Sequence, residues 1–237
     1  RALAIAQEIG NKEAIAAVSN NLGIVFRQLG DFQKALDSYQ RALDIYIEIE
    51  NEEGASYCYN NLGIIYENLG NFEKANEFYE KSLAIKQGSQ DMKGLATSYM
   101  NMGNVYKFLG NHPKAEDYYN QALEISKSIN DEQGRALALG SIAALKLEIN
   151  DYETAIHFAK QSLEIAQAID LKGTVKEAHR QLGWAYNATF VPEWAENEYL
   201  QVISMNHEDI SRNFSILSEC EKELFFRTVA EDFDRFH

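Results

Sequence analysis

The chain has few of the residues that break helices or build disulfide frameworks. Of its 237 residues, two are proline and two are cysteine. The thiols, Cys58 and Cys220, lie far apart in the sequence and in no metal-binding spacing. We therefore expect a reducing compartment, the cytoplasm, and no disulfide framework. The sequence has no run of about 18 apolar residues, so no membrane span is expected.

Positive charge is also scarce. Lys and Arg number 22 against 36 Asp and Glu, which gives a formal net charge of −14. Proteins that bind nucleic acid gather Lys and Arg on one face, so we expect no nucleic-acid partner. The acidity is typical of an extended solvated surface, and an attraction for basic partners is the alternative interpretation.

Motifs for catalysis are missing as well. The sequence has no glycine-rich phosphate loop, no His-Glu-x-x-His zinc helix, no nucleophile elbow and no cluster of His and Cys. A pair of Cys220 with His207 or His237 would lack an orienting third group. We expect this region to be non-catalytic, with no cofactor, no metal site and no catalytic residue.

What the sequence does contain is a repeat. Asn-Asn-Leu-Gly-Ile-Val-Phe at residues 20–26 recurs as Asn-Asn-Leu-Gly-Ile-Ile-Tyr at 60–66 and as Met-Asn-Met-Gly-Asn-Val-Tyr at 100–106. It decays at 140–146 and partly recovers at 180–186, always at a step of 40 residues. A fixed period of this length indicates an array of identical supersecondary units. In the first unit we expect helices near residues 13–29 and 32–49.

The positions that recur resemble the tetratricopeptide repeat. They include Leu22, Gly23, Phe26, Leu29, Gly30, Asp31, Ala35, Tyr39, Leu43 and Ile45. The usual unit has about 34 residues, and the 40-residue step is similar to the repeats of kinesin light chains and of bacterial peptide-sensing regulators. The resemblance implies an all-α fold, a right-handed superhelical solenoid of antiparallel helix pairs, closed by a C-terminal capping or linker helix. Residues 1–12 would be the second helix of a truncated repeat, 13–205 five units, and 206–237 a connector and an amphipathic helix leading to an effector domain outside this sequence.

Glycines and small polar residues predict the turns. Gly30, Gly70 and Gly110 are expected at positive φ, with Asn150 in the equivalent place. The residues that follow are expected to cap the second helices: Asp31, Asn71, Asn111 and Asp151. Recurring glycines inside the first helices imply close helix contact, a space that Ala143 also fits: Gly23, Gly63, Gly103 and Gly183.

By the same resemblance, the first helix of each unit lines a concave groove for a protein or extended peptide. The candidate groove residues are Asn20, Asn21, Arg27, Tyr57, Asn60, Asn61, Asn101, Asn104, Lys107, Arg180, Gln181 and Trp184. Asn21, Asn61 and Asn101 lie in register, and an Asn amide offers the acceptor and donors that match an extended backbone. We expect these side chains to point into the groove and not between helices. The alternative is that they solvate the groove or bond to neighbouring helices.

The C-terminal region carries a second resemblance. Asn-Phe-x-x-Leu-Ser-x-x-Glu-Lys-Glu from residue 213, followed by Phe-Asp-x-Phe at 233–236, is similar to the segment that joins tetratricopeptide arrays to CHAT domains, which are caspase-like cysteine proteases. The array would then be a sensor for a protease beyond residue 237. The alternatives are the sensor of a histidine kinase or peptide-responsive regulator, or a stand-alone scaffold. After a polar connector over 206–213, the last helix would carry an apolar docking stripe: Leu224, Phe225, Val229, Phe233 and Phe236.

Overall fold

A computed structural model describes residues 9–213, and all the regular secondary structure in that range is helical. The helices are α2 (Lys12–Gln28), α3 (Phe32–Glu48), α4 (Glu52–Asn68), α5 (Phe72–Gln87), α6 (Met92–Phe108), α7 (His112–Ser128), α8 (Glu132–Glu148), α9 (Tyr152–Ala168), α10 (Lys172–Ala188) and α11 (Pro192–Asn213). The even-numbered helices begin at steps of 40 residues, as the sequence period predicts. The predicted all-α solenoid of helix pairs is confirmed.

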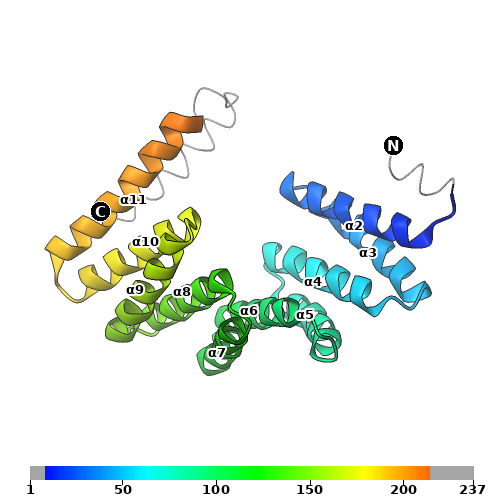
Figure 1. Cartoon of the computed structure of the whole chain (residues 1–237), viewed down its shortest axis with the longest axis horizontal. Helices are drawn as coiled ribbons and strands as arrows, with labels where there is room; N and C mark the ends of the chain where they lie inside the picture. Colours follow the sequence, from blue (N-terminus) through cyan, green and yellow to red (C-terminus); the bar gives the residue numbers. More distant parts are fainter. Residues whose placement is uncertain (1–8, 214–237) are drawn as a thin grey trace.

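The helix pairs follow one another along an arc (Figure 1). Each helix packs mainly against its neighbours in the chain, and first helices of successive units also touch, as α2 does with α4 and α8 with α10. The first helices lie toward the inside of the arc, which is open between the two ends of the array (Figure 1). This arrangement turns one face of every first helix toward a concave surface.

The turns inside the units have the predicted geometry. Gly30, Gly70 and Gly110 have φ values of 75°, 72° and 73°, and Asn150 takes their place with φ 60°. The residue after each turn caps the next helix through its side chain; for example, Asp31 accepts from the backbone N–H of Lys34 at 3.2 Å. Asn71, Asn111 and Asp151 cap their helices in the same way.

The glycines inside the first helices make room for tyrosine rings. A methyl group added at Gly63 would lie 2.5 Å from Cε1 of Tyr79, and one added at Gly103 would lie 2.4 Å from Cε1 of Tyr119. Gly23 and Gly183 meet Tyr39 and Tyr199 in the same way. The expected close contact is therefore confirmed, and its partner is an aromatic ring of the second helix, buried for Tyr39, Tyr79 and Tyr119 and half-buried for Tyr199.

In the fourth unit, different residues form the contact between the first and second helices. Ala143 stands at the glycine position, and Ala159 stands where the other units have tyrosine. Both alanines are buried in one core cluster. The chain thus pairs glycine with tyrosine, and the unit that carries a methyl group at the glycine position lacks the tyrosine ring.

The expected connector over residues 206–213 is wrong, because α11 continues as helix to Asn213. Neither proline nor glycine occurs between Glu193 and Asn213 to end the helix. The polar side chain of Asn206 is buried instead of solvated, and its Oδ1 accepts a hydrogen bond from Lys176 Nζ at 3.0 Å. The half-repeat expected before α2 falls mostly outside the described residues, and the docking stripe falls outside them altogether.

Candidate binding groove

In the first half of the groove, asparagine side chains join successive units. Asn61 Nδ2 donates to Asn20 Oδ1 at 2.9 Å, and Asn101 Nδ2 donates to Asn60 Oδ1 at 2.7 Å. The prediction that these side chains avoid contacts between helices is therefore wrong for Asn61 and Asn101. The physical reason is that first helices of adjacent units approach each other, so residues on their facing edges come within hydrogen-bonding distance.

The asparagine pairs still have groups that a ligand can use. Each pair uses one N–H group of the donor residue and the oxygen of the acceptor residue. The acceptor residues, Asn20 and Asn60, keep their N–H groups, and the donor residues, Asn61 and Asn101, keep their oxygens. The four paired residues are half-buried, and Asn21 is exposed. Asn104 contributes less than expected, because its Oδ1 already accepts from Tyr119 Oη at 2.8 Å.

Arg27 lies at the C-terminal end of α2, half-buried beside Tyr39. Burial raises the pKa of Tyr39, and the nearby Arg27 guanidinium offsets part of that rise. Arg27 is therefore tied to the packing of its own unit, and it takes no part in the pockets described below.

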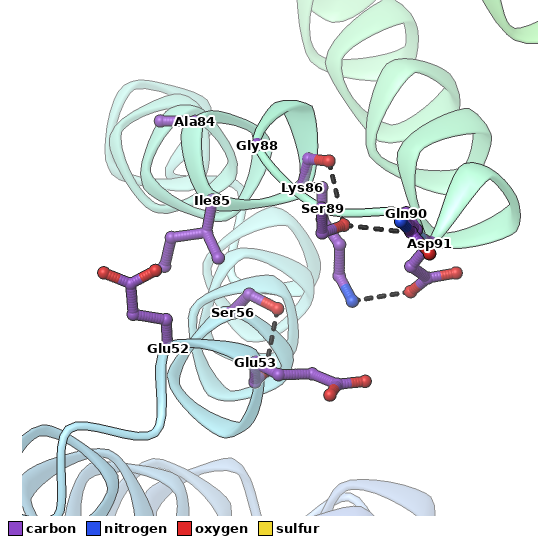
Figure 2. Close-up of a pocket in the computed structure, with 10 residues that line it drawn as sticks. All are labelled: Glu52, Glu53, Ser56, Ala84, Ile85, Lys86, Gly88, Ser89, Gln90 and Asp91. Carbon is purple, nitrogen blue, oxygen red and sulfur yellow. Dashed lines mark hydrogen bonds and ion pairs between the residues drawn. The ribbon is translucent and has the colours of Figure 1, made fainter.

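Tyr57 belongs to a polar cluster at the junction of the second and third units. Its ring lies against Lys86, whose Nζ is 4.0 Å from the ring centroid. Lys86 is only 3% exposed, and its Nζ pairs with Asp91 Oδ2 at 2.6 Å. Figure 2 shows this pair beside a pocket of about 630 Å³ that Glu52 and Glu53 also line.

The Lys86–Asp91 pair also fixes the start of α6. Asp91 Oδ1 accepts from the backbone N–H of Gly94 at 2.8 Å, so one carboxylate both caps α6 and neutralises a buried ammonium. The hydrogen bond from Lys86 lowers the pKa of Asp91. Burial alone would lower the pKa of Lys86, but the bond to Asp91 raises it overall. The sequence contains a signal for this cluster. Lys86 is charged, whereas the residues at the same repeat position in other units are uncharged: Tyr46, Ser126 and Ala166.

The second half of the groove is hollowed by two adjoining pockets. The larger, which we name the Trp184 pocket, has a volume of about 560 Å³ and is lined by Ala144, Leu147, Glu148, Glu177, Arg180, Gln181, Trp184, Asn187 and Tyr199. The smaller, of about 370 Å³, shares Ala144, Glu177 and Gln181 with it and reaches Lys107. The structure thus brings together Arg180, Gln181 and Trp184, three of the groove residues that the tetratricopeptide resemblance implies.

The side chains of the Trp184 pocket have distinct surroundings. Trp184 is 53% exposed, whereas Gln181 is 6% exposed. Gln181 Nε2 donates to the backbone oxygen of Gly140 at 3.1 Å, a bond between units that parallels the asparagine pairs. Arg180 pairs with Glu177, three residues earlier on α10. Glu148, the last residue of α8, lies 3.9 Å from Lys107 Nζ.

Residues 9–213 show no group of three or more His, Cys, Asp or Glu side chains placed to hold a metal ion. In the same range, no helix combines the length and the apolar character needed to cross a bilayer.

A family model of the tetratricopeptide repeat matches residues 1–48, 38–88 and 94–168, which together exceed half of the chain. A search of curated proteins found no match. Among solved structures, the chain is similar to BtubC (BKLC) from P. vanneervenii, with 24% identity over 88% of each chain and a TM-score of 0.75. It is also similar to the apo form of RapI, with 21% identity over 92% of this chain and 78% of that one and a TM-score of 0.70.

Aspartyl phosphate phosphatase F from Bacillus subtilis is a third similar structure, with 11% identity over 97% of this chain and 64% of that one and a TM-score of 0.74. At these identities the structural likenesses show a shared fold. The repeat register, the helix pairs and the matched family model agree with one another. The chain belongs to the tetratricopeptide repeat family, whose arrays are scaffolds for protein interaction and use extended concave surfaces.

Proposed function

We propose that this array binds a protein or an extended peptide in its concave groove. The observation that carries the proposal is the Trp184 pocket: the tetratricopeptide resemblance marks Arg180, Gln181 and Trp184 as groove residues, and they line one hollow of about 560 Å³. A solvent-exposed tryptophan at the edge of a hollow is a typical anchor point for a partner.

The asparagine pairs supply the second element of the proposal. An extended backbone presents alternating N–H and C=O groups, and the pairs Asn20–Asn61 and Asn60–Asn101 offer both partners. Because these contacts involve backbone groups, they hold a peptide without reading its sequence. Side-chain selectivity then falls to the pockets of the fourth and fifth units.

We further propose that peptide binding regulates an effector in the same polypeptide. The motif over residues 213–236 favours a CHAT caspase-like protease as that effector. The alternatives are a histidine kinase, a peptide-responsive regulator or a stand-alone scaffold. The residues that follow position 237 in the full-length protein distinguish them: a His/Cys dyad in an α/β domain supports the protease, and a membrane span or a winged helix excludes it.

Selection from a random phage-displayed peptide library on the immobilised array tests the binding proposal. Synthetic copies of the selected peptides are then titrated against Trp184→Ala and Ile47→Ala arrays. Both residues are exposed large apolar side chains, at 53% and 55%, but Ile47 lies on a second helix, outside the groove. We expect Trp184→Ala to weaken binding by about 2 kcal/mol, roughly 30-fold, because a central aromatic anchor is lost. Equal affinity of both variants for the peptides would refute the groove as the binding site.

A further inference from the structure

Gln181, which lines the Trp184 pocket, carries a buried acceptor that meets no donor among the described residues. Gln181 is 94% removed from solvent, since its exposure is 6%, and its Oε1 has no hydrogen-bond partner there. The orientation of the amide follows from its neighbours: Nε2 faces the backbone oxygen of Gly140 and lies 3.4 Å from Glu177 Oε1. Both neighbours are acceptors, so the nitrogen must face them and the oxygen must face away. A buried acceptor of this kind costs free energy unless something donates to it.

The rest of the pocket favours a positively charged donor. Two carboxylates, Glu148 and Glu177, line the pocket, and the lining contains one cationic side chain, Arg180. Arg180 pairs with Glu177. Glu148 makes no hydrogen bond to a described residue; the ammonium Lys107 Nζ and the ring nitrogen His112 Nδ1 are each 3.9 Å away from its carboxylate.

Helix geometry points in the same direction. The last two turns of α8 supply Ala144, Leu147 and Glu148, and the last two turns of α10 supply Trp184 and Asn187. The C-terminal end of a helix carries partial negative charge, which favours a nearby cation. The pocket therefore lies beside two helix ends of the same polarity.

We propose that the Trp184 pocket binds an arginine side chain of the peptide. This inference rests on the proposed function and names the side chain that the groove selects. A guanidinium has five N–H donors and no acceptor, so it can donate to Glu148 without bringing an unpartnered acceptor into the pocket. It can also donate to Gln181 Oε1 once a small turn of that side chain brings the buried oxygen to the surface of the pocket. Its planar face stacks on the exposed ring of Trp184. A lysine ammonium is a point charge without a planar face, so it satisfies fewer of these groups at once.

The peptides selected on the array provide the test. We expect arginine to be enriched at one position, and replacement of that arginine by citrulline to weaken binding about tenfold or more, because citrulline loses the charge and places an oxygen near Gln181 Oε1. Glu148→Gln should weaken the arginine peptide about tenfold and leave the citrulline peptide unchanged. Glu164→Gln, an exposed carboxylate on α9, is the matched control and should affect neither peptide.

Gln181→Met tests the acceptor itself. In this variant the ratio of the affinities for the arginine and citrulline peptides should fall. Gln181→Met also removes the hydrogen bond to Gly140, but a smaller fraction of folded array lowers both affinities equally and leaves their ratio unchanged. Peptides that depend on Trp184 but show no arginine preference would overturn this inference and leave the proposed function standing; Gln181 Oε1 would then be met by a backbone N–H or by water. An equal preference for lysine would likewise overturn it, and peptides that bind without Trp184 would refute both proposals.

Discussion

Replacing Gly63 by alanine tests how the solenoid packs its units. Gly63 lies in the middle of α4, and an added methyl group would fall 2.5 Å from Cε1 of Tyr79. The ring cannot move away easily, because Tyr79 is fully buried and its hydroxyl donates to Glu67 Oε2 at 2.8 Å. Alanine in place of a helical glycine gains about 1 kcal/mol, and overpacking a buried site costs about 1–3 kcal/mol. We expect the clash to exceed the gain and to destabilise the array by up to about 2 kcal/mol.

The matched control is Gly173→Ala. Gly173 is also helical, in α10, but nothing lies within 4 Å of the position its methyl group would take. Helix propensity should therefore act alone and stabilise the array by about 0.5–1 kcal/mol. Urea unfolding followed by circular dichroism at 222 nm measures both variants.

A double-mutant cycle makes the reasoning stricter. Tyr79→Ala alone should cost about 3–5 kcal/mol because it leaves a cavity. In that background Gly63→Ala should become stabilising, since the methyl group then fills space and the pair reproduces Ala143 with Ala159 of the fourth unit. The interaction energy follows from the four unfolding free energies. If Gly63→Ala stabilised the array in both backgrounds, the contact with the tyrosine ring would not be the reason for the glycine.

Three further predictions concern individual side chains. Asn61→Ala should lower the unfolding free energy by about 1 kcal/mol, measured in urea, because it removes the bond to Asn20; an unchanged midpoint would show that the pair does not join the units. Asp91→Asn should destabilise the array at neutral pH, where the charged carboxylate pairs with buried Lys86. Because the pKa of Asp91 is lowered from 3.8 in the folded array, the stability that this pair contributes is present above pH 3.8 and is lost as the pH falls below it. The urea midpoints of variant and wild type should therefore converge in acid. A constant gap would mean that the pair contributes through shape and not charge. Burial raises the pKa of Cys58 to about 12, so iodoacetamide at pH 8 should label the peptide containing Cys58 only after unfolding, as read by mass spectrometry; rapid labelling of the native array would contradict its burial.

Local sequence signals predicted most of the fold. Position 30 requires a residue that tolerates positive φ, and position 31 requires a side-chain oxygen that can accept from the N–H of Lys34. Gly30 and Asp31 meet these requirements, so residue type alone predicts the turn and the helix cap. The same logic did not identify Glu50 or Phe190, which also have positive φ, at 54° and 59°, because neither residue type signals a left-handed turn. The sequence does not predict the helical course of 206–213, because a run of polar residues is as typical of a connector as of a helix.

The groove was predictable in position but not in detail. Helical spacing puts Gln181 and Trp184 on one face, since residues one turn apart on a helix lie side by side, and the tetratricopeptide resemblance assigns that face to the groove. Which way an amide points depends on its neighbours in the next unit, as in Asn101 and Asn60, and these neighbours are 41 residues away. The unpartnered oxygen of Gln181 follows from its contact with Gly140, 41 residues away, so the sequence alone does not predict it.

Trp184 fluorescence tests the central claim most directly. The array contains two tryptophans, Trp184 and Trp194, so a Trp194→Phe array reports on the groove alone. We predict that a selected peptide changes the emission of this array saturably, and that a Trp184→Phe array, which keeps only Trp194, shows no change with the same peptide. A saturable signal from Trp194 alone, with Trp184 silent at full occupancy, would contradict recognition in the concave groove.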